Sequence, residues 1–135
     1  MNNIYYPLFT MVLLTLLVVL RPLYFNITAV IRKEVHIKHF KLFDEGIPPK
    51  LQSASQHYKN MFEMPILFYV LCVLLIINNN ATSLDIFFAW GFVIFRILHS
   101  ISRIPNRDVN LRFSLFAGSF IMLVAGWIHF AVKVV

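Results

Sequence analysis

The chain is poor in charged residues and nearly without cysteine. Charged residues make up 13% of its 135 residues, whereas apolar residues make up 59%. A soluble domain carries about a quarter of charged residues, so this composition excludes the usual soluble class. The single cysteine, Cys72, excludes an intrachain disulfide and any cysteine-based metal motif. We interpret Cys72 as a small buried apolar residue, and we predict no metal site.

The amino end also lacks the features of a cleaved signal peptide. The segment MNNIYYPLF has no basic residue ahead of the first apolar run, and no small-residue cleavage site follows that run. We therefore expect the run to be retained as a first membrane span. The chain shows no internal repeat and no low-complexity segment, so we expect a single domain over residues 1–135.

Long apolar runs are what the sequence does have. They recur four times, each near the ~20 residues that a bilayer requires. The sequence therefore predicts an all-α membrane protein, a four-transmembrane-helix bundle. Pro22 predicts a kink in the first span, Thr82 and Asp85 have the spacing of a capping box, and Asn106 or Asp108 is expected to cap the last span. The predicted spans are about 4–31, 51–77, 84–104 and 109–135, with a polar loop at 32–50.

The net charge of +6 is expected to set topology rather than to bind nucleic acid. Basic residues cluster in the first loop and around the last turn, whereas the amino tail and the middle turn have none. By the positive-inside rule, both basic connections face the cytoplasm and both termini face the other side. Lys133 is the exception, and Arg103 and Arg107 are also explained as anchors of helix ends at the phosphate layer.

Glu63 lies inside the second span, where a carboxylate is costly unless it is paired. It lies about ten residues from the cytoplasmic end, and Arg21 is about as deep in the first span, roughly 15 Å at 1.5 Å per residue. Arg96 lies roughly 12 Å deep in the third span. We predict that Glu63 forms a structural ion pair with Arg96, Arg21 or both. A pair that holds helices together is favoured over a catalytic one.

The polar residues of the second and third spans outline a basic cavity open to the cytoplasm. On the third span they recur at spacings of three and four, which places them on one helix face. We interpret His99 as a hydrogen-bonded packing residue, because no second His or Cys lies three or four residues away. Arg112, in the first turn of the fourth span, has only Asp108 as a local partner. The cavity residues are Gln56, Asn60 and Glu63 on the second span, and Arg96, His99 and Arg103 on the third.

Two patterns on the fourth span predict packing rather than chemistry. Ser114 and Gly118 are four residues apart, which is the spacing of a close-packing helix face. His129, near the outer end beside Trp127, is interpreted as a membrane-interface residue.

These motifs resemble the MAPEG superfamily, the membrane-associated proteins in eicosanoid and glutathione metabolism. The resemblance covers nearly the whole chain: four spans, a first loop that ends in Pro-Pro, Asn60-x-x-Glu63, Arg96-x-x-His99, and Arg112 at the start of the fourth span. KNMFEMPILFY and RILHS followed by NRDVNLRF look most like the uncharacterised bacterial branch. The resemblance implies a homotrimer in a bacterial inner membrane, with sites between neighbouring subunits that open to the cytoplasm.

The resemblance also implies an activity, a glutathione-dependent transferase or peroxidase that acts on lipophilic small molecules. Arg112 would stabilise the glutathione thiolate, by the logic that activates cysteine near a cation. Asn60 and Glu63 would contact the glutathione peptide, and Arg32 or Lys33 would meet a carboxylate. The predicted cofactor site is completed by Gln56 and His99, which line the same cavity.

Some positions depart from the family pattern. Gln56 stands where an arginine is common, Met64 stands where a tyrosine often follows the glutamate, and the stretch SISRIPNR has no tyrosine. These changes remove several of the side chains that are expected to contact glutathione. An alternative therefore stays open: a non-catalytic scaffold or lipid-binding protein that retains the fold and whose arginines hold phospholipid headgroups. A transporter is a third, weaker alternative, because only Pro22 offers a break in a helix.

Overall fold

Four helices run along one another in this protein. A computed structural model describes residues 3–33, 49–103 and 108–135. Its elements are α1 (Tyr5–Ile31), α2 (Pro49–Ile77), α3 (Ser83–Arg103) and α4 (Val109–Val134). No strand occurs in these ranges, which confirms the all-α fold. Eight side chains of α2 fall outside the description: those of Lys50, Leu51, Ser53, Ala54, His57, Tyr58, Asn60 and Met61.

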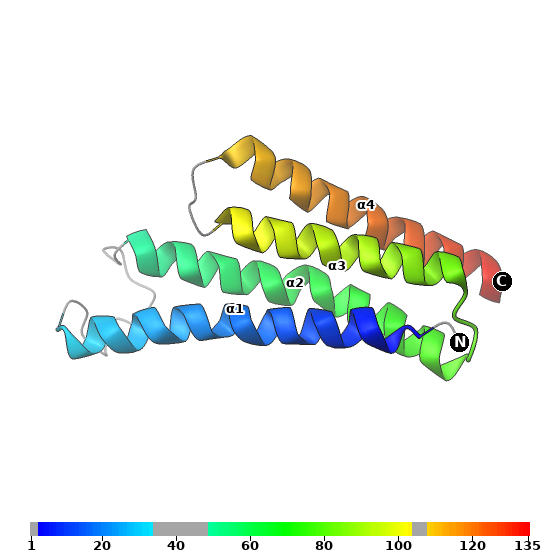
Figure 1. Cartoon of the computed structure of the whole chain (residues 1–135), viewed down its shortest axis with the longest axis horizontal. Helices are drawn as coiled ribbons and strands as arrows, with labels where there is room; N and C mark the ends of the chain where they lie inside the picture. Colours follow the sequence, from blue (N-terminus) through cyan, green and yellow to red (C-terminus); the bar gives the residue numbers. More distant parts are fainter. Residues whose placement is uncertain (1–2, 34–48, 104–107) are drawn as a thin grey trace.

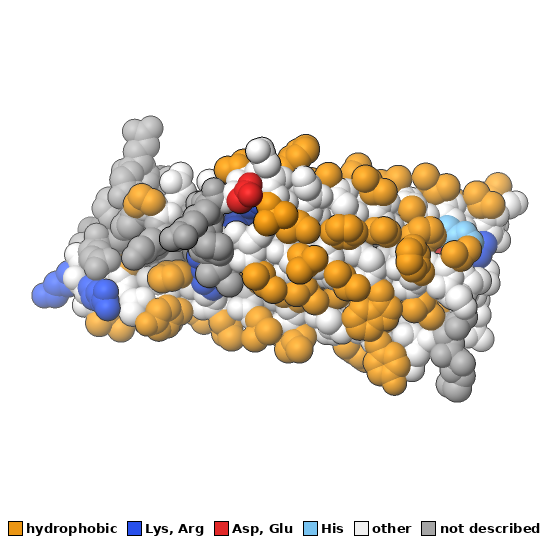
Figure 2. Space-filling view, turned by 45° about the horizontal axis from the view of Figure 1, so that its top comes forward, with side chains coloured by type: hydrophobic (Ala, Val, Ile, Leu, Met, Phe, Trp, Pro, Cys, Tyr) orange, Lys and Arg blue, Asp and Glu red, His pale blue; other side chains and the backbone are white. Residues whose placement is uncertain are grey.

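The helices have the length and composition of an integral membrane protein. α1, α3 and α4 are each long and apolar enough to cross a bilayer. α2 differs because its first half is polar, and its apolar part is the shorter stretch Phe62–Ile77. The two ends of α2 nevertheless lie toward opposite ends of the bundle (Figure 1). Figure 2 shows hydrophobic side chains over most of the visible face, with basic side chains gathered toward one end.

The helix ends are staggered at one end of the bundle. α1 and α2 extend well beyond the level at which α3 ends and α4 begins, and both termini lie at the opposite end (Figure 1). Arg21, ten residues before the end of α1, therefore lies within electrostatic range of Arg103, the last residue of α3. The depth of Arg21 in the membrane stays a prediction.

The core joins two helix pairs, α1 with α2 and α3 with α4. Phe68 of α2 stacks on Phe92 of α3, with ring centroids 4.6 Å apart and ring planes 15° from parallel. Cys72 is 1% exposed within this core, which confirms its interpretation as a buried apolar residue. In a bilayer the lipid tails are as apolar as the helix surfaces, so the hydrophobic effect does not drive helices together. Dispersion contacts of this kind hold them together instead. The other buried apolar residues of the core are Ile4, Met11, Val18, Leu71, Leu75, Ala89, Val93, Leu123 and Phe130.

Small residues allow α3 and α4 to approach closely. A Cβ atom on Gly118 would lie 2.7 Å from the ring of Phe95, and one on Gly91 would lie 2.8 Å from the sulfur of Met122. Neither position can take a larger residue without a shift of its neighbour. The small residue predicted at Gly118 is thus used for packing within the chain.

Local signals explain where α3 and α4 begin. The N–H of Thr82 donates to Asp85 Oδ2 at 2.7 Å and the N–H of Asp85 donates to Thr82 Oγ1 at 3.4 Å, a capping box as predicted. Asp108 caps α4 by accepting from the N–H of Leu111 at 3.1 Å, whereas Asn106 lies outside the described residues. α1 continues through the buried Pro22 as one helix.

A polar cluster ties the turn before α3 to the end of α4, and we call it the Asp85 cluster. The Asp85 side chain is 1% exposed, and its Oδ2 accepts from Lys133 Nζ at 2.5 Å and from Thr82 Oγ1 at 2.7 Å. Lys133 also donates to the carbonyl of Asn80 at 2.8 Å. His129 Nε2 lies 3.8 Å from Asp85 Oδ1. Antiparallel packing places the first turn of α3 beside the last turn of α4, and this explains Lys133, which the charge rule left as an exception.

Candidate functional site

One face of α3 carries the predicted basic residues. Arg96, His99 and Arg103 are 0%, 2% and 6% exposed, so the spacing of three and four places them on a buried face as predicted. Arg103 and Arg112 both lie within electrostatic range of His99, and Arg112 also lies within range of Arg103. The structure thus gathers the predicted cations of α3 and α4 at the end of the bundle where α3 ends.

Arg96 occupies an aromatic slot. Its guanidinium carbon lies 5.4 Å from the ring centroids of both Phe92 and Phe116, a cation–π contact on each. The His99 ring also lies near Phe116, with centroids 6.2 Å apart. Within the described part of the chain, Nε, Nη1 and Nη2 of Arg96 are buried without a hydrogen-bond partner. Sequence reasoning missed both phenylalanines, because an apolar residue on an apolar helix carries no signal of its role.

Gln56 meets Arg103 at the level where α3 ends. Nη2 of Arg103 donates to Gln56 Oε1 at 3.3 Å, and this contact sets the register of α2 against α3. The two helices are antiparallel. Seven residues forward along α2 from Gln56 and seven residues back along α3 from Arg103 therefore lead to Glu63 and Arg96 at the same level. The predicted match in depth between Glu63 and Arg96 is therefore consistent with this register.

The predicted ion pair is not formed within the single chain. Glu63 is exposed, on the side of α2 opposite the buried Phe68 and Leu75. The ion pairs found among the described residues both involve Asp85, and neither joins Glu63 to Arg96 or Arg21. The physical reason is rotation rather than depth, since the helix turns its Glu63 side outward. Any pairing of Glu63 with Arg96 requires a further partner that covers this side of α2.

The remaining predicted residues are dispersed. Arg21 of α1 lies 5.8 Å over the ring of Phe25, and its Nη1 is buried without a hydrogen-bond partner in the described ranges. Arg32 and Lys33 are exposed at the far end of α1, beyond the end of α3. The side chain of Asn60 lies outside the described residues. The chain therefore brings together Gln56, Arg21, Arg96, His99, Arg103 and Arg112, and leaves Arg32, Lys33 and Glu63 apart.

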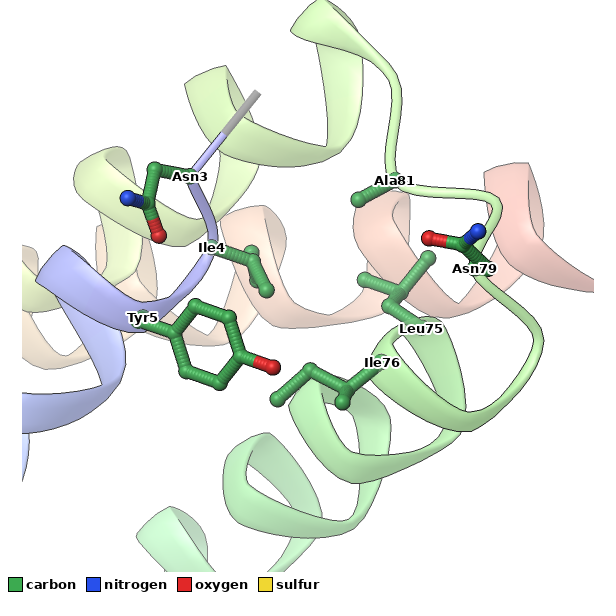
Figure 3. Close-up of a pocket in the computed structure, with 7 residues that line it drawn as sticks. All are labelled: Asn3, Ile4, Tyr5, Leu75, Ile76, Asn79 and Ala81. Carbon is green, nitrogen blue, oxygen red and sulfur yellow. The ribbon is translucent and has the colours of Figure 1, made fainter. Parts of the chain in front are cut away.

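A pocket of about 350 Å³ lies at the opposite end of the molecule, where the start of α1 meets the turn between α2 and α3. Asn3, Tyr5 and Asn79 contribute its polar groups, and Ile4, Leu75 and Ile76 contribute apolar ones (Figure 3). The described lining contains no charged side chain, so this pocket is separate from the basic site. No group of three or more His, Cys, Asp or Glu residues is gathered within the described ranges.

Comparison with known families decides the assignment. The MAPEG family model matches residues 4–132, nearly the whole chain. The chain belongs to the MAPEG family. No curated protein and no solved structure matches it. The predicted resemblance is confirmed, and the four-helix fold of this MAPEG protein is that of an integral membrane protein.

The donor set of this MAPEG protein fits an anionic group. Arg96 and Arg103 are almost fully buried, and each has guanidinium nitrogens without a hydrogen-bond partner in the described part of the chain. A buried charged donor left unsatisfied costs free energy, and guanidinium groups pair best with carboxylate or phosphate. The site can therefore hold an acidic ligand at the end of the bundle where α3 ends.

Proposed function

We propose that this MAPEG protein is a glutathione-dependent transferase or peroxidase that acts on lipophilic small molecules. One observation supports the proposal above the others: buried guanidinium nitrogens of Arg96 and Arg103 lack partners in the described residues, and Arg112 lies nearby. Glutathione carries two carboxylates and an ionisable thiol, which are the anionic groups that such donors bind. The helices carry long apolar surfaces, so a lipophilic substrate can enter from the bilayer.

Each residue has a stated role in this proposal. Glutathione, when bound, would supply a thiolate that displaces a leaving group from an electrophile and forms a carbon–sulfur bond. Alternatively, two glutathione molecules would be oxidised to the disulfide while a hydroperoxide is reduced to an alcohol and water. Arg112 holds the negative sulfur, because a nearby cation favours thiolate over thiol. Asn60 and Glu63 contact the peptide, and Arg32 or Lys33 meets a carboxylate. Gln56 and His99 line the site.

Arg112→Ala is expected to abolish the thiolate that forms on addition of glutathione. Loss of one charge-assisted hydrogen bond also weakens glutathione binding by about tenfold or more. The measurement is the ultraviolet difference absorbance of the thiolate with purified protein in detergent, together with a thermal-shift titration. Asn78→Ala, in the exposed turn after α2 at the opposite end of the bundle, is the control and is expected to keep the signal. Absence of thiolate absorbance in the wild type at saturating glutathione would exclude this reaction.

We also propose that the protein is a homotrimer assembled along α2. Eight exposed residues of α2 recur at alternating spacings of four and three, the heptad pattern of a helix seam. The apolar half of this α2 seam has β-branched residues at both heptad positions, a composition that favours more than two strands. The polar half carries Glu63, and exposing its carboxylate to lipid tails would cost free energy. The α2 seam consists of Gln52, Gln56, Lys59, Glu63, Ile66, Val70, Val73 and Ile77.

Val70→Phe is expected to reduce or abolish assembly, because the larger ring does not fit between closely packed seams. Leu16→Phe on α1 is the matched control: Leu16 is equally apolar and exposed, but lies outside the α2 seam. The mass of the protein in detergent, corrected for bound detergent, reports the outcome. Equal masses for both variants and the wild type would show that α2 does not form the interface.

Orientation and membrane form the last part of the proposal. We place the basic end of the bundle in the cytoplasm of a bacterium and the protein in its inner membrane, in contact with lipids. Both termini then lie on the non-cytoplasmic side, which agrees with their common position opposite the basic end (Figure 1).

A further inference from the structure

Arg103 is held in place and only partly satisfied. It is 6% exposed, and its Nη2 donates a hydrogen bond to the side-chain oxygen Oε1 of Gln56 at 3.3 Å. Its Nε is buried without a hydrogen-bond partner in the described residues. Because Gln56 fixes one side of the guanidinium plane, the Nε edge keeps a defined direction. A guanidinium edge of this kind is preorganised for an oxyanion.

A second guanidinium, on another helix, lies within electrostatic range of Arg103. It belongs to Arg21 of α1, and its Nη1 is also buried and unpartnered within the described ranges. Arg112 of α4 adds a third positive charge to Arg103 from a third helix. Like charges repel, so their gathering costs free energy unless an anion lies among them.

None of the described acids pairs with Arg21 or Arg103. Asp85 lies toward the opposite end of α3 and is paired with Lys133. Asp108 caps α4 through Leu111, and Glu63 forms no ion pair in the described part of the chain. Within the described residues, Nη1 of Arg21 and Nε of Arg103 are therefore open to an anionic ligand.

The position of the group also restricts the ligand. It lies at the level where α3 ends, beside the longer α1 and α2 (Figure 1). Apolar helix surface lies to one side of this level; on the other side α2 is polar, whereas α1 stays apolar up to Ile31. A ligand here can carry its charge among the arginines and an acyl chain along the apolar surface.

We propose that Arg21 and Arg103, with Gln56 as the positioning residue of Arg103, bind a phosphate monoester group. Donors on two different helices can each bind a different oxygen of a tetrahedral phosphate dianion, whereas a carboxylate presents two oxygens in one plane. The group belongs either to a lipid headgroup or to a soluble phosphate monoester. This inference goes beyond the proposed thiol chemistry, because it assigns a ligand that needs neither glutathione nor the thiolate role of Arg112.

The test measures binding of three probes to the purified full-length protein in uncharged detergent, without glutathione. The probes are short-chain phosphatidate, short-chain phosphatidylcholine and inorganic phosphate, titrated by calorimetry. We expect phosphatidate to bind about tenfold or more tightly than phosphatidylcholine, since each lost charge-assisted bond is worth about a factor of ten. Phosphatidate binding alone identifies a lipid headgroup, and inorganic phosphate binding of similar strength identifies a soluble ligand.

Variants decide whether the arginines cause the preference. Arg103→Gln and Arg21→Gln are each expected to weaken phosphatidate binding about tenfold, and Gln56→Ala to weaken it less. Arg103→Lys keeps the charge but loses the planar fork, so the preference for phosphatidate over phosphatidylcholine should fall even if Arg103→Gln does not fold. Asn78→Ala, in the exposed turn after α2 at the opposite end of the bundle, is the control and should bind as the wild type. Wild-type binding by both arginine variants, or an equal loss in Asn78→Ala, would overturn the proposal, and neither result would affect the thiolate test on Arg112.

Discussion

Arg96→Met is expected to stabilise the protein by about 1 kcal/mol or more, because it replaces a buried charge that has no ionic partner in the described part of the chain by an apolar side chain. The guanidinium of Arg96 is 0% exposed, so its desolvation cost is not offset by water. Glu63→Gln is expected to change stability little by comparison, because Glu63 is exposed and forms no ion pair with Arg96. The midpoint of denaturant unfolding in mixed micelles measures each change in stability.

The double variant provides the decisive comparison. The effects of Glu63→Gln and Arg96→Met should add in the double variant, with a coupling below about 0.5 kcal/mol, as for residues that do not interact. An ion pair formed in the assembly would give the opposite sign. Each single variant would then lose stability, because one partner of a buried pair is removed, and the double variant would recover most of the loss.

Lys133→Met is expected to cost about 3 kcal/mol, because it leaves the Asp85 carboxylate buried without its cation. In the native protein Lys133 Nζ lies 2.5 Å from Asp85 Oδ2 and ties the last turn of α4 to the first turn of α3. Thermal unfolding in detergent should show the loss for a protein that keeps its helical circular dichroism. Asp85→Asn combined with Lys133→Met should recover stability, since no charge then remains buried.

The double variant separates the charge of Lys133 from its packing. A loss of stability that persists when Asp85→Asn is combined with Lys133→Met would show that Lys133 acts through packing rather than through its charge.

Helix positions and the basic face of α3 could be predicted because their signals are local. Long apolar runs bounded by Pro, Asn and Asp residues specify helices whatever surrounds them, and spacings of three and four place Arg96, His99 and Arg103 on one face. The capping box at Thr82 and Asp85 depends only on nearby backbone groups. Family membership followed from the order of these same motifs along the chain.

Relations between helices could not be predicted in the same way. Depth was counted from the end of each helix, and this count does not include the stagger by which α1 extends past α3. The direction in which Glu63 points depends on how α2 is rotated against its neighbours, which a list of spacings does not contain. The contacts of Lys133 with Asp85 and of Arg103 with Gln56 each join residues nearly fifty positions apart. Such pairs follow from the turns and the packing rather than from any short motif.

The burial of Cys72 has a practical consequence for every experiment above. The only sulfhydryl of the chain is 1% exposed, so a maleimide fluorophore added to the folded protein finds nothing to label. Labelling begins only when helices α1 to α4 separate. The wild-type chain is thus its own reporter of denaturation, and a variant that has come apart can be distinguished from one that has merely lost a ligand.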